Sequence, residues 1–223
     1  MNEQKRPMEF ADPLEALYQS QEPGVLAYIT AVEGPSYRPL GAEMAFLADG
    51  SRVGTLSSGC IESDFSLHAE RALRSMKPTK VRYGKGSPYF DIRLPCGGGL
   101  EVTLVPRPDQ AVLSEIVERR ASRVPVVLRV DNENGALSLL ENGKTETAER
   151  HFQIRYSPET RFVIFGKGPE AVSLAALVQA TGYSNLLYSP DQETRASAEI
   201  SGSPAFDLRP GAFPSDLIVD QWT

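Results

Sequence analysis

The sequence predicts an α/β protein, in which a mixed α/β N-terminal domain is followed by a small βαβαβ layer. Two patterns lead to this expectation. Residues 1–141 alternate short apolar runs of strand type with segments of helical periodicity. Residues 161–223 have the order strand, glycine loop, helix, strand, helix, strand, which is typical of a parallel sheet. A chain of 223 residues has room for both parts.

The N-terminal domain begins with a helix, a strand and a hairpin. Asp12 can cap the helix in DPLEALYQS. The apolar run at 25–32 predicts a buried strand, and the glycines and prolines of 33–42 predict a loop. The dipeptide Asp49-Gly50 then joins two strand-like runs, EMAFL and SRVGTL, as a hairpin.

The rest of this domain contains two longer helices separated by strands. Apolar residues recur at helical spacing from Glu62 to Met76, and Asp109 caps a second helix at 110–121. The remaining apolar runs predict strands at 80–83, 100–105, 124–131 and 136–140.

The composition changes near residue 142, where ENGKTETAERHFQIRYSPET is mostly polar. This segment predicts a linker at 142–160, with room for one edge strand. It would separate an N-terminal domain at 1–141 from a C-terminal domain at 161–223.

The C-terminal domain is predicted to be half of a Rossmann fold. The strand RFVIF leads into GKGPEA, a G-x-G-x-x-A loop, and then into a helix. A second strand (NLLYS), a weak helix (DQETRASAEI) and a third strand (DLIVD) follow. Only the first mononucleotide half of the fold is therefore expected.

The glycine loop of this domain either contacts a phosphate through Gly166 and Gly168 or serves only the packing of strand against helix. In a dinucleotide fold such a loop brings a pyrophosphate to the helix N-terminus. Here Pro169 lacks a backbone N–H, and Glu170 places a negative charge in the first turn. We expect no tight binding of NAD(P) or FAD, and any other phosphate contact stays open.

Charge and composition exclude several kinds of partner. The net charge is −6 and the pI about 5.1, whereas nucleic acids and anionic membranes attract clusters of Lys and Arg. No run approaches the roughly 18 apolar residues of a membrane span. The first residues lack an apolar signal core. We expect a cytoplasmic protein with no nucleic-acid or membrane partner.

Both cysteines of the chain lie in glycine turns, Cys60 in GCIESD and Cys96 in LPCGGGLEV. In the cytoplasm they should stay reduced. The two histidines, His68 and His151, do not complete a zinc-site spacing, and we expect them to be packing or surface residues. Glycine beside each thiol lets a ligand approach the backbone, although a role as a small buried hydrophobe is the alternative.

The segments around these turns resemble the XdhC/CoxI family, the xanthine dehydrogenase accessory factors. That family carries a G-x-x-x-R-x-x-G-x-x-M segment, a glycine turn with C-x-E, and a later CGG turn before a strand. The matching residues here are Gly34, Arg38, Gly41 and Met44; Gly54, Gly59, Cys60 and Glu62; and Cys96, Gly97 and Gly98. The family also has a C-terminal Rossmann-type domain, which would be present here in shortened form at 161–223.

The resemblance implies a chaperone that binds the molybdenum cofactor (molybdopterin) and helps to insert its sulfurated form into a molybdenum hydroxylase. The client would be an apo-enzyme of the xanthine dehydrogenase, aldehyde oxidase or CO dehydrogenase type. A cysteine desulfurase and a second copy of the chain, in a homodimer, would be further partners. The cofactor-binding residues would be Arg38, Gly41, Gly59, Cys60, Glu62, Cys96, Gly97, Gly98, Gly166 and Gly168.

Within this site the turns of Cys60 and Cys96 are expected to meet at one edge of the sheet, with the two thiols as metal ligands, because thiolates are soft donors. Cys60 precedes a helix, so we expect it to touch molybdenum or relay sulfur. Glu62 would orient a pterin N–H, and Arg38 would bind the phosphate of the cofactor.

Two other functions stay open on the residues alone. One is an NAD(P)-dependent oxidoreductase or nucleotide-binding module, which depends on GKGPEA alone. The other is an interaction module that has lost its ligand. No convincing acid–base set is visible, which favours a non-enzymatic accessory protein and assigns no catalytic residue.

Overall fold

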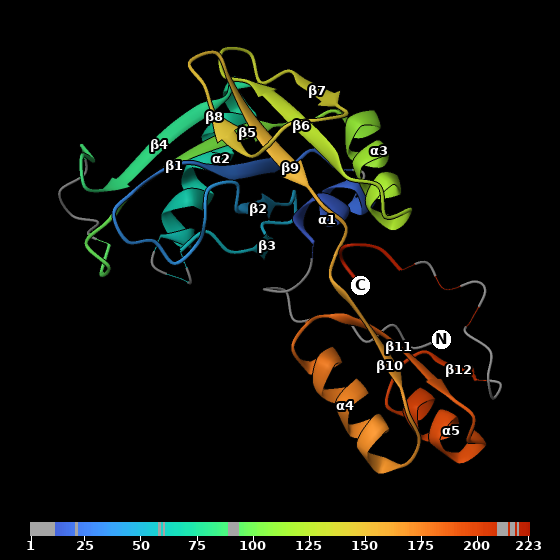
Figure 1. The fold of residues 1–223 in the computed structure, drawn as a ribbon. Helices are drawn as coiled ribbons and strands as arrows, with labels where there is room; N and C mark the ends of the chain where they lie inside the picture. Colours follow the sequence, from blue (N-terminus) through green and yellow to red (C-terminus); the bar gives the residue numbers. More distant parts are fainter. Residues whose placement is uncertain are drawn as a thin grey trace. The chain divides into compact units, whose positions relative to one another are not determined.

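The structure of the protein, a computed structural model, describes residues 12–20, 22–57, 59, 61–88, 94–208, 214, 217 and 219–223. The chain divides between Ser157 and Pro158 into a larger unit and a smaller one, which includes residues 158–223 (Figure 1). Both units combine helices with strands, so the predicted mixed α/β class is confirmed.

From residue 12 to residue 140 the larger unit follows the predicted order of elements. Its helices are α1 (Pro13–Ser20), α2 (Glu62–Ser75) and α3 (Gln110–Ala121). Its strands are β1 (Val25–Glu33), β2 (Glu43–Phe46), β3 (Arg52–Gly54), β4 (Thr79–Gly84), β5 (Gly99–Pro106), β6 (Val126–Asp131), β7 (Leu137–Leu140), β8 (Glu146–Thr147) and β9 (His151–Tyr156). Asp12 caps α1 as predicted, because its Oδ1 accepts from the Leu14 backbone N–H at 2.9 Å.

A five-stranded antiparallel sheet, in the order β3-β2-β1-β5-β4, forms the centre of this unit. Strand β1 is buried on both faces, since successive side chains of a strand point to opposite sides. Val25, Ala27 and Ile29 pack in the core under α2, where Phe65 meets the Tyr83 ring edge-on at 4.8 Å. This sheet and α2 form the first hydrophobic core.

A second sheet covers the opposite face of the first. Its order is β7-β6-β9-β8, and all of its pairings are antiparallel. The core between the sheets includes Leu26 and Tyr28 from β1 and Phe152 from β9, and the Tyr28 and Phe152 rings lie 6.2 Å apart. Helices α1 and α3 contribute Leu14 and Leu113 to the same core.

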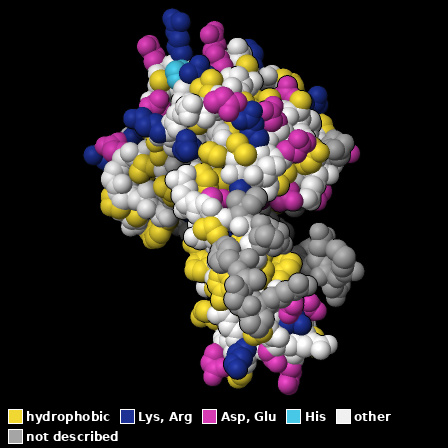
Figure 2. Space-filling model, turned by 45° about the vertical axis from the view of Figure 1, so that its right-hand side comes forward, with side chains coloured by type: hydrophobic (Ala, Val, Ile, Leu, Met, Phe, Trp, Pro, Cys, Tyr) yellow, Lys and Arg dark blue, Asp and Glu magenta, His cyan; other side chains and the backbone are white. Residues whose placement is uncertain are grey.

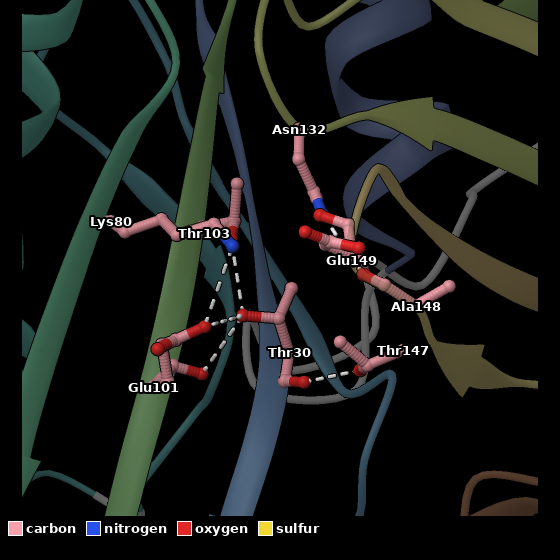
Figure 3. Close-up of polar contacts among 8 residues, drawn as sticks. All are labelled: Thr30, Lys80, Glu101, Thr103, Asn132, Thr147, Ala148 and Glu149. Atoms are coloured by element: carbon pink, nitrogen blue, oxygen red, sulfur yellow. Dashed lines mark hydrogen bonds and ion pairs between the residues drawn. The ribbon is translucent and has the colours of Figure 1, made fainter.

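Thr30 joins the two sheets at an irregularity in β1. The register between β1 and β5 shifts around this residue. Figure 3 shows the buried Thr30 hydroxyl facing β5, where it lies 3.0 Å from Thr103 Oγ1 and 3.3 Å from Glu101 Oε1. On the other side the Thr147 hydroxyl of β8 donates to the Thr30 carbonyl oxygen. At the bulge, the backbone carbonyl of Thr30 is therefore the acceptor for a hydrogen bond from the second sheet.

The segment 142–160 differs from the predicted linker, because it supplies strands β8 and β9. Strand β9 lies inside the second sheet, between β6 and β8, and its Phe152 and Ile154 are buried. Polar residues dominate the composition of this segment and alternate with these apolar ones along β9. Because successive side chains of a strand point to opposite faces, only the apolar face of β9 lies in the core. The boundary between the units falls after this strand.

The smaller unit contains a parallel three-stranded sheet, as predicted. Its elements are β10 (Arg161–Phe165), α4 (Pro169–Ala180), β11 (Ser184–Ser189), α5 (Gln192–Ile200) and β12 (Ala205–Asp207). The strand order is β10-β11-β12. Its small core includes Ile164, Leu187 and Ala175.

The third strand of this sheet was expected at the wrong place. It is β12 (Ala205–Asp207), a three-residue strand after Pro204, whereas DLIVD was predicted. The described residues of DLIVD, which are Leu217, Val219 and Asp220, carry no strand assignment. Further along the chain, Trp222 reaches β10, since the Arg161 backbone N–H donates to the Trp222 carbonyl at 2.8 Å. The apolar and β-branched composition of DLIVD favoured it as the third strand. The segment that pairs with β11 is instead Ala205–Asp207.

None of the helices in the described ranges has both the length and the apolar composition needed to cross a bilayer.

Candidate functional site

Two of the three motif segments meet at one end of the five-stranded sheet. The loop after β1 begins with Gly34 and Pro35, and the turn before β5 ends with Gly98. A Cβ added to Gly98 would lie 2.0 Å from the Pro35 carbonyl oxygen, so only glycine allows this approach. The Gly98 carbonyl in turn accepts from the Lys85 backbone N–H at 3.0 Å, which ties the end of β4 to the same point. We call this meeting point of residues 33–35, 84–86 and 96–99 the glycine corner.

The motif glycines serve different purposes. Gly98 is required by packing. Gly41 has a left-handed φ of 85° as well as close packing, because a Cβ there would lie 2.9 Å from the Thr145 side chain. Gly59 and Gly97 have left-handed φ angles of 102° and 73°, and a Cβ on either would meet no atom within 4 Å. These two glycines leave open space beside their backbones, where a ligand can approach.

Cys96 lies in the turn of the glycine corner. The Gly97 backbone N–H closes this turn by donating to the Leu94 carbonyl at 2.9 Å. Cys96 is half-buried and packs against the core under α2, which also contains Ile61 and Leu94. The thiol is therefore held by a rigid support while part of the residue stays accessible.

Cys60 lies outside the described residues, so its predicted meeting with Cys96 stays a prediction. Its neighbours on the chain are described: Gly59 faces open space, and Ile61 is buried in the core that Cys96 contacts. Within the described ranges, no cluster of three or more His, Cys, Asp and Glu side chains could hold a metal ion.

Glu62, the first residue of α2, is committed to the shape of the turn before it. Its Oε1 accepts from Thr55 Oγ1 at 2.8 Å, from the Leu56 backbone N–H at 3.2 Å and from the Ser57 backbone N–H at 2.8 Å. Its Oε2 accepts from Ser57 Oγ at 2.5 Å and from the Ile61 backbone N–H at 3.1 Å. The carboxylate therefore fixes both ends of the segment that carries Gly59.

These bonds also decide the charge of Glu62. Burial raises its pKa, but the hydrogen bonds from the turn, led by the Ser57 side chain, outweigh this and lower the pKa to about 2. Both oxygens of the ionised group are already used within the protein. Glu62 therefore positions the turn, and its expected bond to a pterin N–H stays a prediction.

Arg38 lies on the surface of the loop that leaves the glycine corner. Ser36 Oγ stabilises a local turn by donating to the Arg38 carbonyl at 2.7 Å. Across the described ranges, no hydrogen bond or ion pair of the Arg38 guanidinium is found. The Gly41 backbone N–H donates to the Ile29 carbonyl at 2.9 Å, so the loop is anchored at both ends. The predicted role of Arg38 toward an anion is compatible with this exposed position.

Residue patterns missed a polar cluster on the first turns of α2. The Tyr83 hydroxyl of β4 donates to Asp64 Oδ2, and His68 Nε2 lies 3.3 Å from the same oxygen. His68 is buried, as expected for a packing residue, but it has a carboxylate neighbour that was not anticipated. The i, i+4 spacing of Asp64 and His68 on one helix could have predicted their contact. The contact with Tyr83 could not be predicted in this way, because it depends on how β4 packs against α2.

Gly166 and Gly168 belong to the smaller unit. The Gly168 backbone N–H, which a bound phosphate would use, donates to Thr194 Oγ1 at 2.8 Å. The Thr194 hydroxyl donates to Asp191, the cap of α5. Gly166 is close to Ala171, since a Cβ on it would lie 3.1 Å from the Ala171 Cβ. These contacts favour a role in strand–helix packing, and the predicted phosphate contact of Gly166 and Gly168 stays a prediction.

The chain has matches among family models, curated proteins and solved structures, and those given below are named for XdhC, xanthine dehydrogenase or the molybdenum cofactor. Residues 17–84 match the model of the XdhC and CoxI family. The molybdenum cofactor insertion chaperone PaoD of Escherichia coli (strain K12) is 36% identical over 176 residues, which are 78% of this chain and 55% of PaoD. A probable xanthine dehydrogenase subunit from Bacillus subtilis (strain 168) is 28% identical over 205 residues, 78% of this chain and 62% of that protein.

A solved structure shows the same fold. The crystal structure of a xanthine dehydrogenase from Bacillus halodurans superposes with a TM-score of 0.77 at 23% identity, and the match covers 92% of this chain and 70% of that one. The chain spans between about half and two thirds of the length of the two curated relatives.

Proposed function

Because residues 17–84 belong to the XdhC and CoxI family, we propose that the chain is a molybdenum cofactor chaperone. It would bind the cofactor and assist its sulfuration and its insertion into a molybdenum hydroxylase. The observation that carries this proposal is the similarity to PaoD, which spans most of the chain. Since PaoD is much longer than the matched segment, the complete activity is part of the proposal.

The residues of the larger unit fit such a ligand. Gly97 and Gly59 leave open space beside their backbones, which suits a planar group or a phosphate. Cys96 is half-buried and supported by the core, and thiolates suit a thiophilic metal. When bound, the cofactor supplies the molybdenum and dithiolene on which the client hydroxylase depends. The chain itself would hold this group and shield it until transfer.

The partners follow from the same proposal. The client would be an apo-enzyme of the xanthine dehydrogenase, aldehyde oxidase or CO dehydrogenase type. A cysteine desulfurase would supply sulfur, with Cys60 as the relaying thiol, and the protein would act without turnover chemistry of its own. A homodimer is part of this proposal as well.

The test is metal and pterin analysis of the full chain, purified without oxygen from a host supplied with molybdate. We expect molybdenum and pterin to co-purify in equal amounts, and Cys60→Ala to lose most of both while circular dichroism stays unchanged. Cys96→Ala should lose less. If the unaltered protein carries neither molybdenum nor pterin, the proposed function is wrong. If both variants retain the cofactor as the parent does, the proposed role of the thiols is wrong.

A further inference from the structure

A carboxylate is held between two cations at the glycine corner. Glu33 is the last residue of β1, directly before Gly34. Its Oε2 lies 2.6 Å from Arg82 Nη2, and its Oε1 lies 2.7 Å from Lys85 Nζ. The hydrogen bond and charge of Lys85, followed by the charge of Arg82, hold the pKa of Glu33 below its usual value. Each oxygen of one anion thus has its own cationic donor.

Arg82 has a second partner besides Glu33. Its Nε donates to the Lys85 carbonyl oxygen at 2.9 Å, so the backbone already fixes the plane of the guanidinium. Two glycines leave room for it: a Cβ on Gly86 would lie 2.9 Å from Arg82 Nε, and one on Gly99 would lie 3.3 Å from Nη2. The donor group is therefore held by a backbone acceptor as well as by its carboxylate partner, in space that the two glycines leave free.

We infer that Arg82 and Lys85 form an anion subsite, which takes a phosphate monoester or a pyrophosphate and for which the Glu33 carboxylate competes. A fixed guanidinium and an ammonium that hold two oxygens of a carboxylate present the donors that two oxygens of a phosphate require. The two cations and one anion sum to +1, in a chain of net charge −6.

The subsite is continuous with the turn of Cys96. Gly99, which borders the Arg82 guanidinium, is the third glycine of that turn and the first residue of β5. This inference rests on the proposed function, because it assigns the phosphate end of the cofactor to Arg82 and Lys85. Arg38, on the neighbouring loop, would then be an additional cation and not the main one.

The test is calorimetric titration of the full chain with inorganic phosphate and with inorganic pyrophosphate at fixed ionic strength. We expect Arg82→Gln to weaken binding about tenfold, as loss of a charge-assisted bond requires, and Lys85→Gln to weaken it several-fold. Glu33→Gln should strengthen binding several-fold, because the competing charge is gone. A preference for pyrophosphate over phosphate would indicate a dinucleotide form of the ligand, and the reverse would indicate a monophosphate.

Arg119 is a matched control in the same unit, since it is also held by two carboxylates, Glu115 and Glu141. Arg119→Gln and Glu141→Gln should leave phosphate binding unchanged. If Arg82→Gln behaves like Arg119→Gln, or Glu33→Gln like Glu141→Gln, the subsite is wrong. Should Arg82→Gln fail to fold, Lys85→Gln decides the matter, because its largely exposed side chain makes no contribution to the core.

The cofactor analysis separates this inference from the proposed function. If the chain retains the cofactor but phosphate binding ignores Arg82 and Lys85, the subsite is wrong and the chaperone remains. If phosphate binding depends on these residues but no preparation ever contains the cofactor, the subsite remains and the chaperone is wrong.

Discussion

Two glutamates of the larger unit show how neighbours decide the charge of a single residue. Glu62 is surrounded by donors of its own turn and is ionised down to pH about 2. Glu43 lies at the start of β2, where it accepts from the Tyr156 hydroxyl at 2.6 Å. Burial, followed by the negative charge of Asp12, raises the pKa of Glu43 to about 8, and the Tyr156 bond opposes this only in part. One glutamate is a fixed anion, and the other is mostly neutral at pH 7.

The raised pKa of Glu43 makes the stability of the fold depend on pH. Folding keeps the proton that the unfolded chain releases above pH 4.5, so this stabilisation is complete below pH 4.5 and is lost as the pH rises to about 8. The loss should be on the order of 2–4 kcal/mol. Arg120 and Arg38 also face the group, and both limit the shift. We expect Glu43→Gln to remove this dependence in urea titrations between pH 5 and pH 8.

Glu141 supplies the control for this prediction, because its exposed carboxylate has a lowered pKa. Glu141→Gln should leave the slope between pH 5 and pH 8 as it is. A Glu43→Gln protein that loses stability over this range as steeply as the parent would mean that Glu43 is ionised in the fold.

Glycine turns are the elements on which the candidate site depends, and their glycines act through two different mechanisms. Gly98 is needed because backbone from another segment approaches it, and Gly97 is needed because its φ is left-handed. Sequence motifs cannot separate these mechanisms, since both require the same residue. The contacts separate them, and of the motif glycines described in the larger unit, Gly59 and Gly97 are those beside open space.

Gly98→Ala tests the packing role directly, because Gly98 does not need a left-handed φ. The new methyl group would lie 2.0 Å from the Pro35 backbone oxygen, so the glycine corner must shift. We expect a loss of about 3 kcal/mol in unfolding free energy, measured by urea denaturation. Gly166→Ala is the matched control in the smaller unit, where the nearest contact is 3.1 Å, and it should cost less than about 1 kcal/mol. If both variants lose the same unfolding free energy, the glycine corner can shift without a penalty and the packing role of Gly98 is wrong.

At this scale the sequence predicted most elements of the larger unit but not every pairing. Strands such as β1 and β5 carry long apolar runs, and helix α3 has a capping Asp109 at its start, which accepts from the Ala111 backbone N–H at 2.8 Å. Strand β9 was not expected inside a sheet, because its buried residues alternate with polar ones in a polar segment. Strand β12 was missed because three residues carry too little pattern to compete with DLIVD.

The sequence could predict which residues of the site lie in loops, but not the contacts that those residues make. The motifs placed Arg38, Cys96 and Gly97 in loops, where the structure has them. The role of Glu62 could not be read from the sequence, because it depends on Ser57 and Thr55 folding back onto the carboxylate. The pairing of residues 33, 82 and 85 depends on the order of strands in the sheet.

At the scale of the whole molecule, the two units have different kinds of glycine loop. Figure 2 shows Lys and Arg side chains interspersed with Asp and Glu over the face in view. The open glycines, Gly59 and Gly97, are in the larger unit, whereas the loop of the smaller unit is closed by its own side chains. The comparison with a solved xanthine dehydrogenase structure extends over both units and shows their fold.

The closed loop of the smaller unit predicts that the chain does not bind NAD(H) tightly. The Gly168 backbone N–H donates to Thr194, Pro169 has no N–H, and Glu170 adds a negative charge at the start of α4, so a pyrophosphate would lose its usual partners. Titration with NADH, followed through the fluorescence of Trp222, should give a dissociation constant above about 100 µM. Thr194→Ala frees the Gly168 N–H and should strengthen binding by a few-fold at most, because Pro169 and Glu170 remain. A constant in the low micromolar range for the unaltered chain, about −8 kcal/mol, would show that the loop opens for a dinucleotide.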